Sequence, residues 1–232
     1  MLNHYKIRFL LYKLGIRDTI PAQIINRIPI VENKEDLVDI KQDKTLFFGD
    51  KISNRNEIFL RKTVYQKLKE AQSYLPENYH FKIYSAFRSL EEQKKLWNAK
   101  YLLMHNRYPD LSEEEIVKKT RAVCADPRHG FGGHQTGGAL DVSLCDAQGN
   151  DYQMGTQHSE NNEKTHTKAK HLSILENKNR YILQNALTKV GFVNYPAEWW
   201  HFSYGDRMWA AYSRKKNCFY GLVPMKRGSY EN

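Results

Sequence analysis

The segment HGFGGHQTGGALDVSL, at positions 129–144, limits the fold more than any other part of the chain. Its second half, ALDVSL, alternates side chains in the manner of a strand that presents two different faces. Leu140, Val142 and Leu144 then share an apolar face, while Asp141 lies on the opposite one. A carboxylate in such a strand is costly to bury unless another group pairs with it. We therefore expect Asp141 to have a partner, either a metal ion or a hydrogen-bonding group.

Five glycines precede this strand and allow sharp turns and close approach to the backbone. They do not fit the loops that bind nucleotide phosphates. A G-x-G-x-x-G fingerprint begun at Gly130 would place its third glycine at Gln135, and a strand rather than a helix follows. The G-K-[ST] ending of a P-loop is absent as well. We interpret the loop instead as one that can bring His134 back toward Asp141, seven residues later.

A second cluster of chemistry-bearing residues lies in the segment EWWHFSYG at 198–205. Glu198 and His201 are three residues apart and flank two tryptophans. Together with His134 and Asp141, His201 would give a set of two imidazoles and one carboxylate. This is the ligand set of a catalytic zinc site. Glu198 would then be the general base that takes a proton from the activated water. The alternative is an aromatic core strand with a hydrogen-bonded histidine.

Arg88 stands at the junction between a predicted strand, over 80–87, and a predicted helix. The helix begins at Ser89, because Glu92 follows at the spacing of a capping box. An arginine at such a place commonly forms a surface ion pair. At the end of a strand that feeds a cleft, it can instead bind a substrate carboxylate or a developing oxyanion.

The remaining patterns predict helices and strands around these segments. Further helices are indicated by three kinds of signal: apolar residues three and four positions apart, capping-box spacings and a terminal glycine. The segments GFVNYP and EWWHFSYG indicate two strands joined by a tight turn. The helices are expected over 56–75, from Ser112 onward and over 178–190, with a long polar segment over 145–176.

Strands and helices do not alternate regularly along the chain. We therefore predict an α+β fold with one domain, in which helices flank a mainly antiparallel sheet and the zinc site lies in a cleft. No internal repeat or low-complexity linker divides the chain. Residues 1–50 are expected to form an N-terminal extension that packs on the core formed by residues 51–232.

Composition narrows the choice of partner and compartment. Lysine and arginine number 36 against 26 acidic residues, which gives a formal net charge of +10. These cations are scattered, so we predict no nucleic-acid partner; the charge also suits an anionic wall polymer. Three cysteines without a CxxC pair argue against a thiolate metal site and favour a reducing, cytoplasmic location over a periplasmic one. No segment reaches the roughly 18 apolar residues of a membrane span.

Three motifs occur in this order in one known family. They are S-x-x-R-S-x-x-x-Q at 85–93, H-x-x-G-x-A-x-D at 134–141 and E-x-W-H at 198–201. With these motifs, the chain resembles the zinc D-Ala-D-Ala metallopeptidases of the VanX and VanY group, and the VanX-like dipeptidases in particular. The resemblance extends over about residues 55–205. It implies that residues 51–232 form a zinc D,D-peptidase domain.

The resemblance also implies roles for individual residues. One Zn²⁺ per chain would be held by His134, Asp141 and His201. Glu198 would be the general base and Arg88 would stabilise the tetrahedral intermediate. The implied function is hydrolysis of the D-Ala-D-Ala dipeptide, a small D-amino-acid peptide, by a zinc-activated water in cell-wall peptide metabolism. Substrate-binding roles are implied for Ser85, Gln93, Glu160 and Trp200.

Two departures from the family pattern concern the substrate. Gly132 stands where the family has serine, and Ser159 stands where the dipeptidases have an acidic residue that holds the substrate ammonium. Either the neighbouring Glu160 substitutes, or the enzyme does not need a free amino terminus. A D,D- or L,D-carboxypeptidase or endopeptidase on peptidoglycan peptides is therefore the alternative. A non-catalytic zinc-binding module is disfavoured, because it would need neither the general base nor the arginine.

Overall fold

The structure, a computed structural model, describes residues 4–224 and is built around a five-stranded sheet of order β2-β4-β5-β7-β6. Strand β2 pairs parallel with β4, and every other neighbouring pair in this sheet is antiparallel. The predicted α+β class with a mainly antiparallel sheet is therefore confirmed. The strands are β2 (Phe47–Phe48), β4 (His80–Ser85), β5 (Ala139–Cys145), β6 (Val193–Asn194) and β7 (His201–Ser203), with a separate pair of β1 (Leu37–Asp39) and β3 (Phe59–Arg61).

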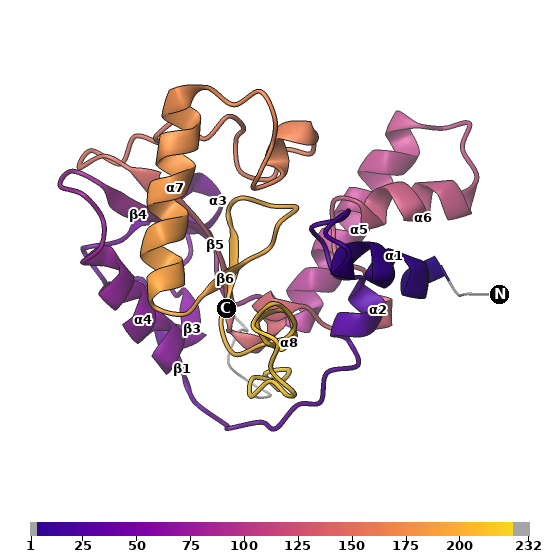
Figure 1. The fold of residues 1–232 in the computed structure, drawn as a ribbon, viewed down its shortest axis with the longest axis horizontal. Helices are drawn as coiled ribbons and strands as arrows, with labels where there is room; N and C mark the ends of the chain where they lie inside the picture. Colours follow the sequence, from indigo (N-terminus) through magenta and orange to yellow (C-terminus); the bar gives the residue numbers. More distant parts are fainter. Residues whose placement is uncertain (1–3, 225–232) are drawn as a thin grey trace.

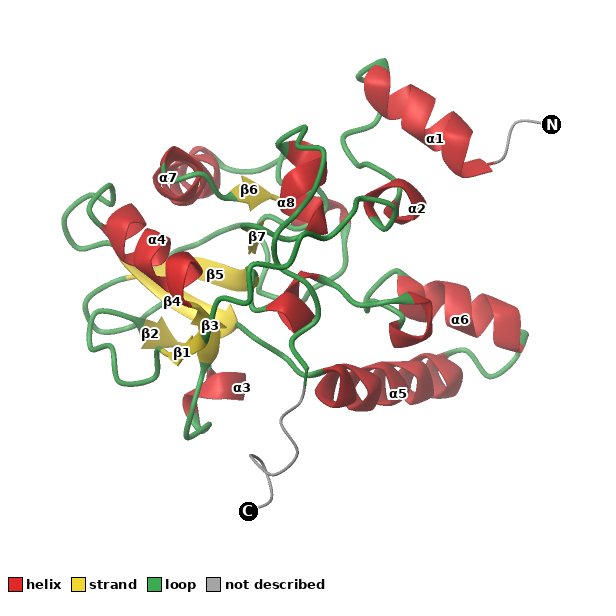
Figure 2. Ribbon diagram, turned by 90° about the horizontal axis from the view of Figure 1, so that it is seen from below, coloured by secondary structure: helices red, strands yellow, loops and turns green. Residues whose placement is uncertain are grey.

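Helices α4 and α7 lie on the same side of the central sheet (Figures 1 and 2). Helices α5 and α6 form a hairpin that stands away from the sheet, and α1 lies at the edge of the molecule beside α2 (Figure 2). Among the described residues, none of these helices has the length and apolar character that crossing a membrane requires. The helices are α1 (His4–Lys13), α2 (Ala22–Ile25), α3 (Asp50–Ser53), α4 (Lys62–Gln72), α5 (Leu90–Arg107), α6 (Glu113–Arg121), α7 (Ile174–Lys189) and α8 (Arg207–Tyr212).

Strand β5 is buried along its whole length. One of its faces packs into the hydrophobic core, and the other carries its polar side chains. Leu140, Val142 and Leu144 are fully buried in one core cluster with Leu68 of α4 and Leu183 of α7. Burying each such side chain stabilises the fold by roughly 1.5–3 kcal/mol. This packing fixes which face of the strand points away from the core, and the alternation predicted from the sequence is confirmed.

Two predicted helix boundaries were wrong. The helix expected over 56–75 begins only at Lys62, because residues 59–61 pair with β1 as strand β3. Their apolar side chains continue the helical spacing in the sequence, which hides the change of structure. Helix α7 begins at Ile174 rather than at 178, because Ser173 and Glu176 form a capping box inside the polar segment. The capping boxes expected at Ser89 and Ser112 are both present.

The polar segment between β5 and α7 is anchored to the body of the protein by Arg180. This buried side chain donates to the backbone carbonyls of Met154, Lys164 and His166 at 2.6–2.7 Å, and its guanidinium lies over the ring of Trp199. Burial lowers the pKa of Arg180 to about 10, which leaves it charged at neutral pH. A charged donor that satisfies three carbonyls at once ties this segment firmly to helix α7.

Candidate metal centre

The antiparallel pairing of β5 with β7 places His201 directly opposite Asp141. On its other side, Asp141 lies opposite Ser85 of β4. Residues that are directly opposite in an antiparallel pair have neighbouring side chains, so the sheet itself brings the imidazole and the carboxylate together. Both groups are buried, at 7% exposure for His201 and 6% for Asp141. The carboxylate singled out in the sequence therefore has a histidine as its cross-strand partner.

His134 reaches the same carboxylate from a short 3-10 turn, η2 (Gly133–Thr136), immediately before β5. The turn ends at Gly137 in the left-handed conformation, with φ of 71°. A Cβ at Gly133 would collide with the side chains of Asp206 and Ala139. The glycines therefore serve a sharp, tightly packed turn, as expected from the sequence. Within this turn, Nδ1 of His134 donates to the carbonyl of Ala86 at 2.8 Å, which leaves Nε2 facing Asp141.

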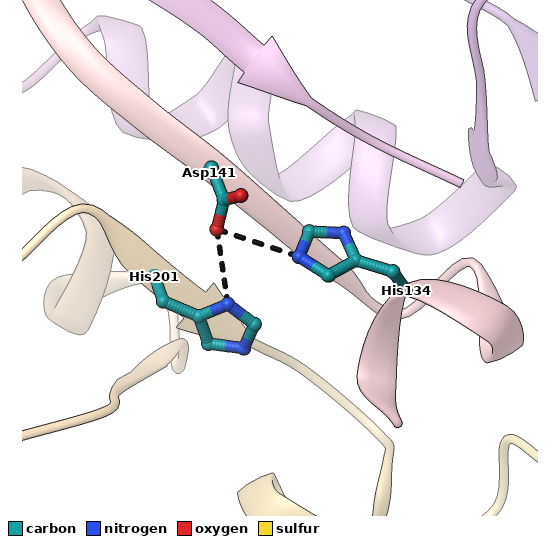
Figure 3. Close-up of side chains that lie close together, drawn as sticks. All are labelled: His134, Asp141 and His201. Carbon is teal, nitrogen blue, oxygen red and sulfur yellow. Dashed lines mark hydrogen bonds and ion pairs between the residues drawn. The ribbon is translucent and has the colours of Figure 1, made fainter. Parts of the chain in front are cut away.

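The three side chains converge on one point (Figure 3). Oδ1 of Asp141 lies 3.0 Å from Nδ1 of His201 and 3.4 Å from Nε2 of His134. One candidate ligand atom from each residue lies within 4.8 Å of the other two. Two imidazole nitrogens and one carboxylate oxygen, all held in a buried position, match the donor set that zinc prefers when one position is left for water or substrate.

Electrostatics favours the protonation states that metal binding needs at two of the three residues. Burial alone would raise the pKa of Asp141, but the surrounding histidines, His134 first, hold it well below its usual range. Burial lowers the pKa of His134, so its imidazole is neutral at pH 7. The pKa of His201 is raised, because the hydrogen bond and charge of Asp141 outweigh the effect of burial. A metal ion would displace that proton on binding.

Glu198 lies at the edge of this group, in the turn that leads into β7. Its Oε2 is 3.9 Å from Nδ1 of His201, and 40% of its side chain is exposed. The turn is fixed by Asn194, whose amide donates to the carbonyls of Glu198, Trp199 and His201 at 3.0–3.2 Å. Although part of the side chain is exposed, desolvation of the carboxyl group beside the buried ligands raises the pKa of Glu198. A raised pKa next to a metal position is what a general base at neutral pH requires.

Arg88 follows β4 and is tied to the loop that carries His134. Its backbone N–H donates to the carbonyl of His134 at 3.1 Å. Its guanidinium donates to Oγ of Ser85 at 2.9 Å and to Oε1 of Gln93 at 2.8 Å. Gln93 is fixed in turn by donating to the carbonyl of Ala125 at 2.8 Å. The structure thus places Ser85 and Gln93, for which substrate binding was predicted, against the side chain of Arg88.

The other two residues predicted to bind substrate lie around His158. Trp200 is buried, with 4% exposure, and packs edge-on against His158. Glu160 is exposed and lines a cavity of about 720 Å³, which also contains Ser143, the residue two positions after Asp141 on β5. Cavities of this size commonly hold small-molecule ligands. Ser143 places this cavity two residues along β5 from Asp141, although none of the three candidate ligands lines it.

His158 is a site residue that the sequence reasoning missed. Its Nε2 lies 3.3 Å from Oδ2 of Asp141, the oxygen that points away from His134 and His201. Its ring stacks on Tyr84, with 4.8 Å between centroids, and it also lines the cavity. One feature of the sequence could have drawn attention to His158. It immediately precedes Ser159, the position at which the chain departs from the dipeptidase pattern.

Comparisons with known proteins find the same peptidase family that the three motifs indicated. The family model described as D-ala-D-ala dipeptidase matches residues 43–221. The curated D-alanyl-D-alanine dipeptidase of Escherichia coli is 29% identical over 125 residues, which are 52% of each chain. The dipeptidase of Synechocystis is 30% identical over 111 residues, which are 39% of this chain and 43% of the relative. The dipeptidase of Enterococcus faecium is 27% identical over 106 residues, which are 45% of this chain and 50% of the relative. The chain spans about half the length of these curated relatives.

Two solved structures are also similar. One is a mutant of the vancomycin resistance D,D-pentapeptidase VanY in complex with Zn(II), with a TM-score of 0.47, 14% identity, and coverage of 82% of this chain and 90% of that one. The other is VanYB in complex with D-alanine-D-alanine, with a TM-score of 0.47, 13% identity and the same coverage. The family model covers most of the chain, including all three motifs, so the chain belongs to the D-ala-D-ala dipeptidase family of peptidases.

Proposed function

We propose that the chain is a zinc-dependent D-alanyl-D-alanine dipeptidase, a metallopeptidase that hydrolyses the free dipeptide in cell-wall peptide metabolism. The observation that carries the proposal is the buried group of His134, Asp141 and His201 with Glu198 at its edge, in a chain of this family. A structural zinc site is normally closed by four protein ligands, whereas three ligands with a carboxyl group beside them fit catalysis. The donor set and its burial fit Zn²⁺, one ion per chain.

The placement of the side chains supports the following reaction. Zinc bound to the three ligands would polarise the scissile carbonyl and acidify the attacking water. Glu198 accepts the proton of that water and passes it to the amine nitrogen as the C–N bond breaks. Arg88 donates to the carbonyl oxygen as that oxygen gains negative charge. Ser85 and Gln93 hold the guanidinium of Arg88 in place for this role.

The substrate would occupy the cavity that His158 and Ser143 line, with Glu160 as its contact there. Trp200 packs against His158 and would contribute to substrate binding through that ring. Glu160 supports the dipeptidase assignment, because its exposed carboxylate lines the cavity and can pair with the ammonium of a free dipeptide. A cytoplasmic location is proposed as well. All three cysteines, Cys124, Cys145 and Cys218, are free, as is usual in a reducing compartment.

A D,D- or L,D-carboxypeptidase or endopeptidase acting on peptidoglycan peptides is the second candidate. It is favoured by Ser159, which stands where the dipeptidases carry the acidic residue that holds the substrate ammonium. Such an enzyme would not need a free amino terminus, and its longer substrates would extend beyond the cavity.

Comparing D-Ala-D-Ala with its N-acetyl derivative separates the two candidates. A carboxylate paired with a desolvated ammonium contributes roughly 1.5–3 kcal/mol, so the dipeptidase should hydrolyse the free dipeptide with kcat/KM about 10–100-fold higher. Glu160→Gln should remove most of this preference, whereas Glu163→Gln, an exposed glutamate of the same segment, should keep it. Equal rates for both substrates in the wild-type protein would reject the dipeptidase assignment. Zinc binding without hydrolysis of either would indicate a non-catalytic zinc-binding module.

A further inference from the structure

Each of the three proposed zinc ligands has a second polar atom that faces away from the centre. In His134 this atom is Nδ1, which donates to the carbonyl of Ala86 at 2.8 Å. In His201 it is Nε2, which lies 3.4 Å from Oγ of Ser203. Such outer contacts fix the tautomer and orientation of metal-binding side chains. The corresponding atom of Asp141 is Oδ2, and its contact is the Nε2 of His158 at 3.3 Å.

The ring of His158 is held firmly enough to orient a neighbour. It stacks on Tyr84 with an interplanar angle of 16°, and Trp200 meets it edge-on at 5.5 Å between centroids. Tyr84 is fixed in turn by a hydrogen bond of 2.5 Å from its hydroxyl to Asp151. Only 11% of the His158 side chain is exposed. Two aromatic neighbours therefore leave the imidazole little freedom to turn away from Asp141.

The contact with Asp141 also selects the tautomer of His158. Oγ of Ser159 lies 3.0 Å from Nδ1 and 3.3 Å from Nε2, so it sits over the face of the ring and favours neither nitrogen. An ionised carboxylate only accepts hydrogen bonds, so Nε2 carries a proton and donates it to Oδ2 of Asp141. Within residues 4–224, the group whose candidate ligand atoms lie within 4.8 Å of one another consists of His134, Asp141 and His201, so His158 lies outside it.

We propose that His158 is a positioning residue, which holds Oδ2 of Asp141 so that only Oδ1 faces the metal ion. This inference rests on the proposed zinc-dependent function. Without the imidazole N–H, the carboxylate can rotate and present both oxygens, which weakens the geometry of the ligand group. A carboxylate bound through one oxygen also keeps the remaining coordination position free for water or substrate.

Zinc affinity tests the role directly, because it is measured without turnover. His158→Phe keeps an aromatic ring between Tyr84 and Trp200 but removes the N–H donor. Competition with a chromogenic chelator should show zinc binding about 10–100-fold weaker in this variant. His158→Gln returns an N–H donor at similar reach and should bring the affinity back to within about threefold of the wild type. His105→Phe, at an exposed histidine of α5, is the matched control and should bind zinc like the wild type.

The outcomes separate this inference from the proposed function. If the wild-type chain binds zinc and hydrolyses the dipeptide while His158→Phe binds zinc equally tightly, the positioning role is wrong and the function stands. If His158→Gln keeps a wild-type circular dichroism spectrum yet fails to restore affinity, the hydrogen bond to Asp141 is not what His158 supplies. A wild-type chain that binds no zinc contradicts the proposed function itself.

Discussion

Glu198→Ala is expected to keep zinc bound while lowering kcat for D-Ala-D-Ala by about 10²–10⁴-fold, the usual contribution of a general base. The carboxyl group lies 3.9 Å from Nδ1 of His201, beside the three-residue ligand group rather than within it. Desolvation beside the ligand group raises its pKa, which makes it a stronger base than an ordinary exposed carboxylate. The measurement is kcat together with the zinc content of the purified variant.

Glu198→Gln is the control for this experiment, because it keeps the size of the side chain and removes the base. Both variants should lose activity to a similar extent and retain one zinc per chain. Loss of zinc from either variant would make Glu198 a ligand instead of a base. Activity within about tenfold of the wild type would be too small a loss for a general base and would contradict the role.

Arg88→Lys is expected to lower kcat by about 10²–10³-fold with little change in KM, as for the loss of a donor to a developing oxyanion. The guanidinium is oriented by Ser85 and Gln93, which accept from its two terminal nitrogens. A lysine ammonium keeps the charge but cannot meet both acceptors and still present a fixed donor to substrate. The measurement is a full kcat and KM determination with the free dipeptide.

Arg55→Lys is the matched control, since Arg55 is exposed and forms a surface ion pair with Glu92. It should leave both kinetic constants within about twofold, because exposed ion pairs contribute little. If Arg88→Lys raised KM and left kcat unchanged, Arg88 would bind the ground state of the substrate rather than stabilise the transition state.

The sequence predicted the parts of the site that depend on local pattern. Alternation in ALDVSL identified the buried strand and put Asp141 on its polar face, because side-chain direction in a strand follows from spacing alone. Capping boxes located the starts of α5 and α6 for a similarly local reason. The grouping of Asp141 with His201 is different. It depends on the register between strands sixty residues apart; the residue types suggested it and the resemblance to a family supported it, but no periodicity predicts it.

The features that were missed depend on tertiary contacts. Strand β3 shares the helical spacing of the residues after it, and its pairing with β1 decides its conformation. His158 lies in a segment without periodicity, whose course over the sheet is set by Arg180 holding three of its carbonyls. No local pattern records that a residue seventeen positions after Asp141 returns to contact it. Such a contact becomes visible only when the segment is seen folded against the sheet.

Titration of the metal-free protein with zinc tests the central claim most directly. Hydrolysis of D-Ala-D-Ala should be absent from the metal-free chain, rise in proportion to added zinc and reach its maximum at one ion per chain. A chelator should abolish it again, and Asp141→Ala should show neither tight zinc binding nor hydrolysis. A metal-free preparation that hydrolyses the dipeptide at the full rate would contradict the account.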